Sequence, residues 1–381
     1  MPVPPELLRA RIAITFYFSL SGFATGTWVS RIPAIAEHLE LSSAVLGTVL
    51  VGTMIGSLVG GFGGEAVWGR WGSKRTTAGA GLAFGLWLPL VALMPGPVWL
   101  FCGLMLYGLF YSTLNIAMNA QASALEVRYG RPIFSMFHSI WSLGALLGAL
   151  AGSSLAGLGF KPWLHFLLVG LVGALLAWRF GPWLLESPTL AGRRVLALPR
   201  GPLLWIGLMA FCVALSDGTA SSWSGVYLRS LKAPESVAAL GFGVHQGVMM
   251  LGRFSGDWMA ARFGPVRLIR FGALFGGLGL ALGVLSGTVP GALLGIGCMG
   301  WGMATTYPLM FAAAARVSAN ATARGIASVA SMSTMGGLIG PILMGNVAEV
   351  GGLDASLLLA AALAGVVSWL AFSLASYRVG T

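Results

Sequence analysis

The sequence has very few charged residues. Only 9 % of its 381 residues are charged, whereas 57 % are hydrophobic and the mean hydropathy is +0.85. A soluble domain needs about 25 % charged residues to cover its surface. Most of the outside of this chain must therefore meet lipid, so the composition excludes an ordinary soluble protein and indicates a membrane protein.

Motifs typical of enzymes and metal proteins are also absent from the sequence. It has no P-loop, no HExxH motif and no cysteine cluster, and Cys102, Cys212 and Cys298 lie in apolar runs where they suit packing. We therefore expect no enzymatic activity, no cofactor and no metal. Transport driven by ATP is excluded for the same reason, so energy must come from an ion gradient or from the gradient of the substrate itself.

Twelve apolar runs are long enough to cross a bilayer as helices, since about 20 residues are needed. The longest polar connection, residues 184–201, lies at the midpoint and predicts a cytoplasmic linker between residues 1–183 and residues 202–381. The first run has no clear cleavage site, so we expect a retained helix there. The runs are 11–30, 43–64, 76–94, 97–121, 133–156, 163–183, 202–224, 237–258, 267–286, 289–313, 325–347 and 354–376.

A motif is repeated at an offset of 192 residues. The segment from Gly60 to Arg75 and the segment from Gly252 to Arg267 both read Gly-x3-Gly-acid-x4-Arg-aromatic-Gly-x2-Arg, and each follows a long apolar run. Two parallel six-helix halves would produce such a repeat.

Basic residues are distributed unequally between the two sides of the predicted bundle. With the N-terminus in the cytoplasm, eighteen of the 22 lysines and arginines fall on the cytoplasmic side, and only Arg31, Lys161, Arg229 and Lys232 fall outside. This bias predicts that both termini are cytoplasmic. It also accounts for the net charge of +11 without a nucleic-acid partner.

The arrangement of helices and loops resembles that of major facilitator superfamily transporters over essentially the whole chain. The family's loop signature, Gly-x3-Asp-Arg-x-Gly-Arg-Arg, is matched in its basic part by Arg70, Gly72, Lys74 and Arg75, although Gly69 occupies the aspartate position. The resemblance implies an all-α membrane protein with twelve transmembrane helices, in two halves related by a pseudo-two-fold axis. It also implies alternating access, a small-molecule substrate and proton coupling.

Longer stretches resemble the bacterial permeases grouped near fucose permease. They include Trp28-x2-Arg31-Ile32-Pro33 and the run from Asp217-Gly218 to Arg229. We accordingly expect a multi-pass protein of the bacterial inner membrane that acts as a monomer.

Acidic and basic residues near the cytoplasmic loops are candidates for gating. Their charges could latch the two halves in one conformation and release them in the other; alternatively, the arginines only anchor the topology. The candidates are Glu65, Arg70, Arg75, Glu126, Arg131, Arg253, Asp257, Arg262 and Arg267.

Asp217 lies well inside the seventh apolar run, whereas most acids lie at helix ends or in loops. A charge at the bilayer centre costs about 2.5–3.5 kcal/mol, so such an acid normally faces a wet cavity or a partner. His245 lies at a similar depth in the eighth run, and the two could exchange a proton. The alternative is a structural Asp217 with a packed His245.

Substrate contacts are expected along three further helices. Tyr107, Tyr111 and Asn115 share one stripe of the fourth run, and Thr25 occupies the place that matches Asp217 in the first half. Polar groups at that depth need partners, which a hydroxylated substrate or a neighbouring helix could supply. Trp301, Thr305 and Tyr307 are the candidates of the tenth run, where aromatic packing is the alternative.

These observations predict a secondary transporter of a small polar solute, such as a sugar, with proton-coupled symport by a permease. An exporter of amphipathic drugs or metabolites that exchanges them for protons is the alternative. A membrane sensor or assembly factor is a third reading, which the intramembrane acid and the repeated loops disfavour.

Overall fold

The structure is a computed structural model that describes residues 4–186, 198–317 and 322–371, without the side chains of residues 64–69, 257 and 322–324. All regular elements in these described ranges are helices. By their contacts they form two compact units: Met1–Leu41 with Thr48–Arg193, and Ser42–Gly47 with Arg194–Thr381.

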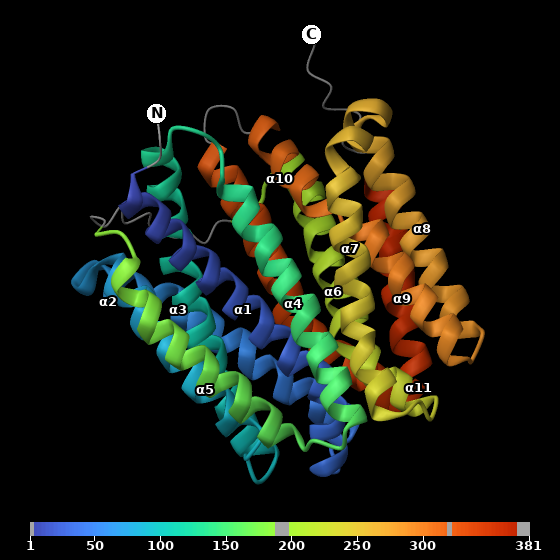
Figure 1. The fold of residues 1–381 in the computed structure, drawn as a ribbon. Helices are drawn as coiled ribbons and strands as arrows, with labels where there is room; N and C mark the ends of the chain where they lie inside the picture. The colour runs from blue at the N-terminus through green and yellow to red at the C-terminus, as the bar shows by residue number, and fades with distance from the viewer. Residues whose placement is uncertain (1–3, 187–197, 318–321, 372–381) are drawn as a thin grey trace. The chain divides into compact units, whose positions relative to one another are not determined.

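The first unit is built from five α-helices and a short 3₁₀ helix within the described residues (Figure 1). These elements are α1 (Pro5–His38), α2 (Ser43–Val91, apart from its first turn), α3 (Pro97–Tyr129), α4 (Phe134–Gly157), α5 (Pro162–Phe180) and η1 (Gly181–Trp183).

The second unit contains six α-helices within its described part. They are α6 (Pro202–Ser230), α7 (Glu235–Phe263), α8 (Pro265–Leu285), α9 (Val289–Met303), α10 (Thr306–Val317) and α11 (Thr322–Leu370).

The predicted apolar runs fall on helices wherever the structure describes them. Helices α2 and α11 each carry two runs, and each is broken once by a glycine with positive φ, Gly72 at 74° and Gly352 at 78°. The tenth run differs from the prediction because it is split into α9 and α10. Pro308 has no N–H to donate to the carbonyl of Ala304, four residues earlier, and the break lies at that carbonyl.

The backbone conformation also repeats at the offset of 192 residues. Gly72 and its counterpart Gly264 both have positive φ, 74° and 82°. The two non-glycine residues with positive φ, Glu40 at 51° and Lys232 at 63°, are separated by the same offset, and each follows a helix that ends with the same pattern of main-chain hydrogen bonds. The two units therefore share local structure well beyond the loop motif.

The helix faces that carry exposed apolar side chains identify the surface in contact with lipid. On α8, side chains at intervals of three or four residues are 40–69 % exposed, among them Phe271, Phe275, Leu278 and Leu282. Soluble proteins rarely leave such stripes uncovered. Eight helices of the described residues are long and apolar enough to cross a membrane. The predicted all-α membrane fold is thus confirmed.

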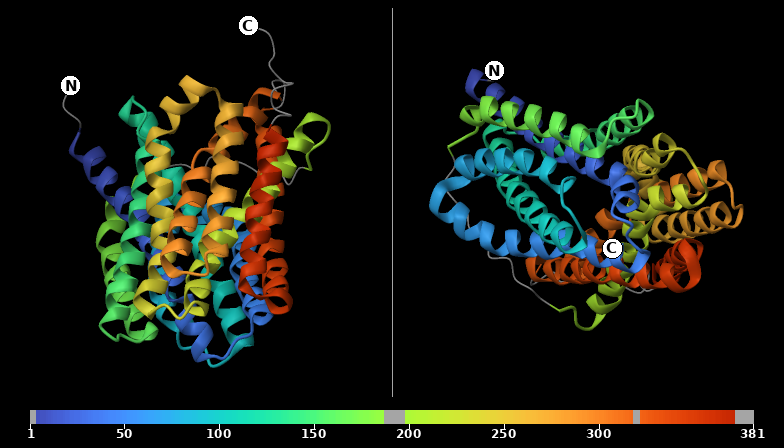
Figure 2. Two further views of the ribbon diagram at one scale, coloured as in Figure 1. Left: turned by 90° about the vertical axis from the view of Figure 1, so that its right-hand side faces the viewer. Right: turned by 90° about the horizontal axis from the view of Figure 1, so that it is seen from below.

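Small residues let neighbouring helices approach closely. A methyl group on Gly22 of α1 would lie 2.0 Å from the carbonyl oxygen of Trp141 in α4, and one on Gly302 of α9 would lie 2.3 Å from that of Gly272 in α8. In the second unit α9 packs against both α7 and α8, and α11 packs against α6 and α8 (Figure 2). Contacts of this kind hold helices together in lipid, where there is no hydrophobic force between them.

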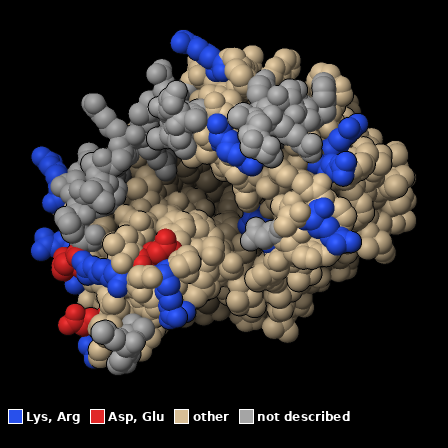
Figure 3. Space-filling model, turned by 90° about the horizontal axis from the view of Figure 1, so that it is seen from above, with Lys and Arg blue, Asp and Glu red and all other residues tan. Residues whose placement is uncertain are grey.

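Lysine and arginine side chains gather on the face shown in Figure 3, which carries few acids. The sequence predicted Arg31 in a loop on the outer side, and this prediction was wrong. Helix α1 continues to His38, and Arg31 lies fully buried inside it, where its guanidinium group donates to the carbonyls of Gly152 and Phe160.

Candidate functional site

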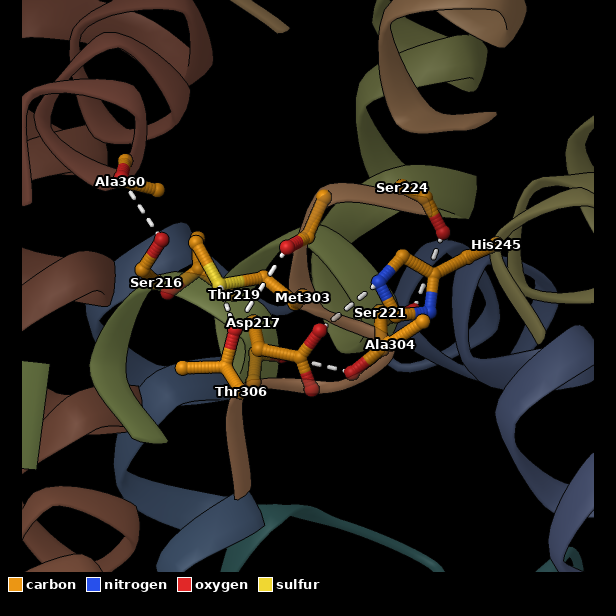
Figure 4. A network of polar contacts seen from close by, with 12 residues as sticks. Ser216, Asp217, Thr219, Ser221, Ser224, His245, Met303, Ala304, Thr306 and Ala360 are labelled. Atoms are coloured by element: carbon orange, nitrogen blue, oxygen red, sulfur yellow. Dashed lines mark hydrogen bonds and ion pairs between the residues drawn. The ribbon is translucent and has the colours of Figure 1, made fainter. Parts of the chain in front are cut away.

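Asp217 of α6 and His245 of α7 lie against each other in the second unit (Figure 4). The Nε2 atom of His245 is 3.0 Å from Oδ1 of Asp217, and the side chains are 0 % and 20 % exposed, respectively. The contact has the distance of an ion pair but not the angle of a hydrogen bond, and Nδ1 of His245 has no hydrogen-bond partner among the described residues. When His245 is protonated, its ionic attraction to Asp217 needs no particular angle and depends on the short distance between the two groups.

Hydroxyl groups surround Asp217 along α6, but they bond elsewhere. Ser216 donates to the carbonyl of Ala360, and Thr219, Ser221 and Ser224 each donate to a carbonyl of their own helix (Figure 4). The carboxyl group is therefore left with His245 as its close partner among the described residues.

Arg253 connects Asp217 to the break between α9 and α10. Its Nε donates to the carbonyl of Ala304 at 3.4 Å, the carbonyl that Pro308 leaves without its usual helical donor. The charges of Asp217 and Arg253 interact, and the charge of Asp217 also acts on Tyr307. The predicted residues Asp217, His245, Arg253 and Tyr307 thus converge in the second unit.

Tyr307 and the other two candidates of the tenth run lie in different surroundings. The hydroxyl of Tyr307 accepts a hydrogen bond from Ser333 of α11 at 3.1 Å. Trp301 and Thr305 instead line an apolar hollow of about 320 Å³ between α7, α8 and α9, whose lining does not include Tyr307. The structure therefore does not bring the three residues into one site.

In the first unit, an aromatic cluster surrounds the predicted stripe of α3. The ring of Phe84 lies 4.9 Å from that of Tyr107 and 6.0 Å from that of Tyr111, and Trp28 lies 6.3 Å from Tyr107. The buried hydroxyl of Tyr107 is close to Thr25, but no described group forms a hydrogen bond of good geometry with it. A polar atom in that position can be satisfied by a bound solute.

Asn115 lies one turn beyond Tyr111 and bonds within its own helix. The amide of Asn119 donates to the main-chain oxygen of Asn115 at 2.7 Å and to its side-chain oxygen at 3.2 Å. Thr53 and Trp141 were not predicted as site residues, yet their buried Oγ1 and Nε1 atoms have no hydrogen-bond partner among the described residues. The offset of 192 residues offered a signal for Thr53, because it pairs Thr53 with His245.

The predicted gating residues have different environments. Glu126 accepts hydrogen bonds from the N–H groups of Ile133 and Phe134, at 2.8 and 2.7 Å, and so caps α4. Arg131 lies over the ring of Tyr129 at 5.2 Å. The side chains of Glu65 and Asp257 are outside the part of the chain that the structure describes. The remaining loop candidates are exposed and form no ion pair with a described acid: Arg70, Arg75, Arg262 and Arg267.

Gln121 joins three segments of the first unit. Its amide donates to Ser73 at 2.7 Å and to the carbonyl of Leu185 at 2.8 Å, and it accepts from the N–H of Leu185 at 2.9 Å. Lys74 pairs with Glu186 at 3.0 Å in the same region. The basic loop after the second apolar run is thus tied to α3 and to the chain that follows η1.

The sequence did not reveal a buried pair of basic residues, Arg31 and His165. His165 of α5 is fully buried, interacts electrostatically with Arg31, and has no hydrogen-bond partner for either ring nitrogen among the described residues. No spacing motif linked the two residues, because their contact depends on how α1 and α5 pack.

Comparison with known proteins settles the family. The chain is 33 % identical to an uncharacterised transporter, y4wD, of Sinorhizobium fredii, across 87 % of this chain and 89 % of that protein. The family model described as Major Facilitator Superfamily matches residues 206–379. The chain belongs to the major facilitator superfamily. It is therefore a membrane transport protein for small-molecule substrates, and its relatives from Sinorhizobium fredii and Yersinia pestis are named as transporters.

Other proteins resemble it over nearly their whole length. The membrane protein MosC of Rhizobium meliloti is 27 % identical across 93 % of this chain and 88 % of its own. Among solved structures, the nucleoside transporter NupG matches with a TM-score of 0.73 at 15 % identity, covering 99 % of this chain and all of that one. A D-xylose–proton symporter matches with a TM-score of 0.76 at 16 % identity, over 95 % and 97 % of the two chains. These structural matches confirm the fold of the superfamily.

Proposed function

We propose that this transporter couples the movement of a small polar solute to the movement of protons, and that Asp217 and His245 carry the proton. The observation that carries the proposal is the contact of 3.0 Å between these two titratable groups inside membrane helices of the second unit. Charged groups in such positions are expensive and mark ion pathways. We place the protein in the bacterial inner membrane, as a monomer with both termini in the cytoplasm, and assign it as a symporter.

The two units differ at the positions of this pair. The offset of 192 residues pairs Asp217 with Thr25 and His245 with Thr53, and threonine does not titrate in the physiological range. At these two positions, therefore, titratable side chains occur in the second unit and not in the first. The first unit keeps hydroxyl groups at the matching places, where they can serve a solute.

The proton changes how Asp217 is held. When His245 is protonated, it neutralises the carboxylate at 3.0 Å. When that proton leaves, the carboxylate attracts Arg253 more strongly, because Arg253 is the other cation that interacts with it. Arg253 also holds the carbonyl of Ala304 at the break between α9 and α10. The protonation state of the pair thus acts on the bend between these helices, which provides a route from proton binding to helix movement.

A buried hydroxyl without a hydrogen-bond partner among the described residues supports the proposed solute class. The hydroxyl of Tyr107 is buried within an aromatic cluster. It could form a hydrogen bond with a hydroxylated ring that stacks on the aromatic side chains of this cluster. NupG and the D-xylose–proton symporter are named for solutes with several hydroxyl groups, and their fold is shared by this chain. We therefore propose a sugar or a related polar metabolite, moved as residues 1–183 and residues 202–381 rock against each other.

Thermal unfolding of the purified protein tests the proposal. One panel would hold neutral sugars and nucleosides, and the other lipophilic cations, at about pH 5.5 and about pH 7.5, on either side of the ordinary titration range of histidine. We expect selective stabilisation by a polar solute that depends on pH in the wild type. The Tyr107→Phe variant should weaken this stabilisation, and Asp217→Asn should remove its pH dependence. Stabilisation by several unrelated cations would instead favour the exporter of amphipathic compounds.

The proposed role of Arg253 can be tested by comparing a variant of this residue with a control variant. Arg253→Gln removes the charge that links Asp217 to Ala304, and we expect transport to slow about tenfold, as for the loss of a charge-assisted hydrogen bond. Arg270→Gln, which removes an exposed arginine of α8 that is not a gating candidate, serves as the control for lost positive charge. Equal slowing by both variants would contradict the proposed link.

A further inference from the structure

The apolar hollow of the second unit lies apart from the contact between Asp217 and His245. Its volume is about 320 Å³, and its walls include Phe271 and Phe275 of α8 and Trp301 of α9. Gly272 and Gly302 form part of the lining where the two helices meet. A methyl group on either glycine would meet the backbone of the other helix, at 2.8 and 2.3 Å, so the two glycines allow the close helix contact beside the hollow.

The hollow opens on the face of α8 that meets lipid. Phe271 and Phe275 are 62 % and 51 % exposed, and Leu278 and Leu282 continue the same exposed stripe at 56 % and 69 %. Side chains at these intervals point to one side of a helix. The space beside the phenylalanines is therefore accessible from the bilayer, where an acyl chain is the abundant apolar occupant.

One positive charge lies at the edge of this apolar lining. Arg267, one turn before Phe271 on α8, is the charged residue of the hollow, and its side chain is exposed. It forms no ion pair with any acid whose side chain the structure describes. Arginine recognises phosphate oxygens well, because its planar group donates two parallel hydrogen bonds.

We propose that this hollow is a binding site for an anionic phospholipid, with an acyl chain in the apolar part and the phosphate of the headgroup at Arg267. The charge complementarity selects this occupant: a neutral apolar molecule would leave Arg267 unused, and a soluble phosphate would leave the hollow empty. The lipid would fill the space between α7, α8 and α9 and brace α9 just before its break. This site does not depend on proton coupling.

The charge selectivity can be tested on the purified full-length protein. Native mass spectrometry would count retained phosphatidylglycerol and phosphatidylcholine, and thermal unfolding would measure the stabilisation by each. We expect selective retention of phosphatidylglycerol in the wild type and about tenfold weaker binding in Arg267→Gln, since a charge-assisted contact is lost. Arg270→Gln, which removes an exposed arginine of α8 outside the hollow, should bind like the wild type. Equal loss in both variants would overturn the proposal, because it would show only general attraction to a basic surface.

The apolar part needs a separate test that keeps every charge. Phe275→Ala removes one wall of the hollow, and we expect it to weaken phosphatidylglycerol binding, whereas Leu278→Ala, at a similarly exposed position of α8 outside the hollow, should not. Both side chains face lipid, so the fold should tolerate their loss. Unchanged binding in Phe275→Ala, or the same selective stabilisation by glycerol phosphate without acyl chains, would contradict a lipid in the hollow.

Discussion

Replacing Asp217 by asparagine should abolish uphill transport while leaving the exchange of solute across the membrane. The amide has nearly the shape of the carboxyl group but cannot take up a proton. A charged His245, fully buried and 3.0 Å from Oδ1, would then lack its counter-ion. The pair should therefore remain in one protonation state throughout the transport cycle.

The size of the effect follows from the energy of the proton gradient. A charge that crosses a membrane potential of about 100 mV gains about 2.3 kcal/mol. With one proton per solute, and about 1.4 kcal/mol for each factor of ten, the wild type should accumulate its solute about 45-fold. The variant should reach equal concentrations on both sides.

Proteoliposomes with an imposed potential would measure both activities. Uptake against a gradient reports coupling, and counterflow of labelled solute reports binding and movement of the helices. Asp354→Asn is the matched control, because Asp354 lies in α11 and accepts a hydrogen bond from Tyr227, a bond that an asparagine oxygen can also accept. Accumulation by Asp217→Asn at the level of the wild type would refute the role of the pair in coupling.

Three further changes test the packing and the loops. Gly22→Ala places a methyl group 2.0 Å from the carbonyl of Trp141, so it should separate α1 from α4 and lower the unfolding temperature strongly, whereas Gly79→Ala, with open space around its Cβ position, should not. Gln121→Leu removes the buried hydrogen bonds to the segments around it and should destabilise the first unit by about 2–3 kcal/mol, measured by chemical unfolding in detergent. Glu126→Ala removes the cap of α4 and should cost about 1–2 kcal/mol, with Glu126→Gln retaining part of it because its amide oxygen can still accept; equal losses would argue against capping.

The sequence was most informative about features that lipid imposes directly. A helix in a bilayer must be long and apolar, so the runs of α1 and α6 were visible without any tertiary contact. The repeat was equally visible, because Gly72 and Gly264 must each permit a positive φ after a membrane helix. Asp217 was conspicuous for the same reason, since few acids occur inside apolar runs.

Features that depend on helix rotation could not be predicted in this way. Periodicity grouped Trp301 with Tyr307, yet the break at Ala304 leaves Trp301 lining the hollow and Tyr307 in contact with Ser333. Arg31 was expected in a loop, because the apolar run ended before it. Helix α1 instead continues past Arg31 and buries it, and its guanidinium group donates to the carbonyl of Gly152 in α4.

The sequence by itself therefore determined that this is a membrane protein of two repeated halves with one unusual intramembrane acid, because each of these features is written in residue types and spacings. Only the tertiary structure decided that His245 faces Asp217, that Arg253 takes the carbonyl left free by Pro308, and that a hollow lies beside Trp301. The physical reason is that residues on different helices meet according to how the helices rotate and pack, and packing depends on many small contacts that no single segment encodes.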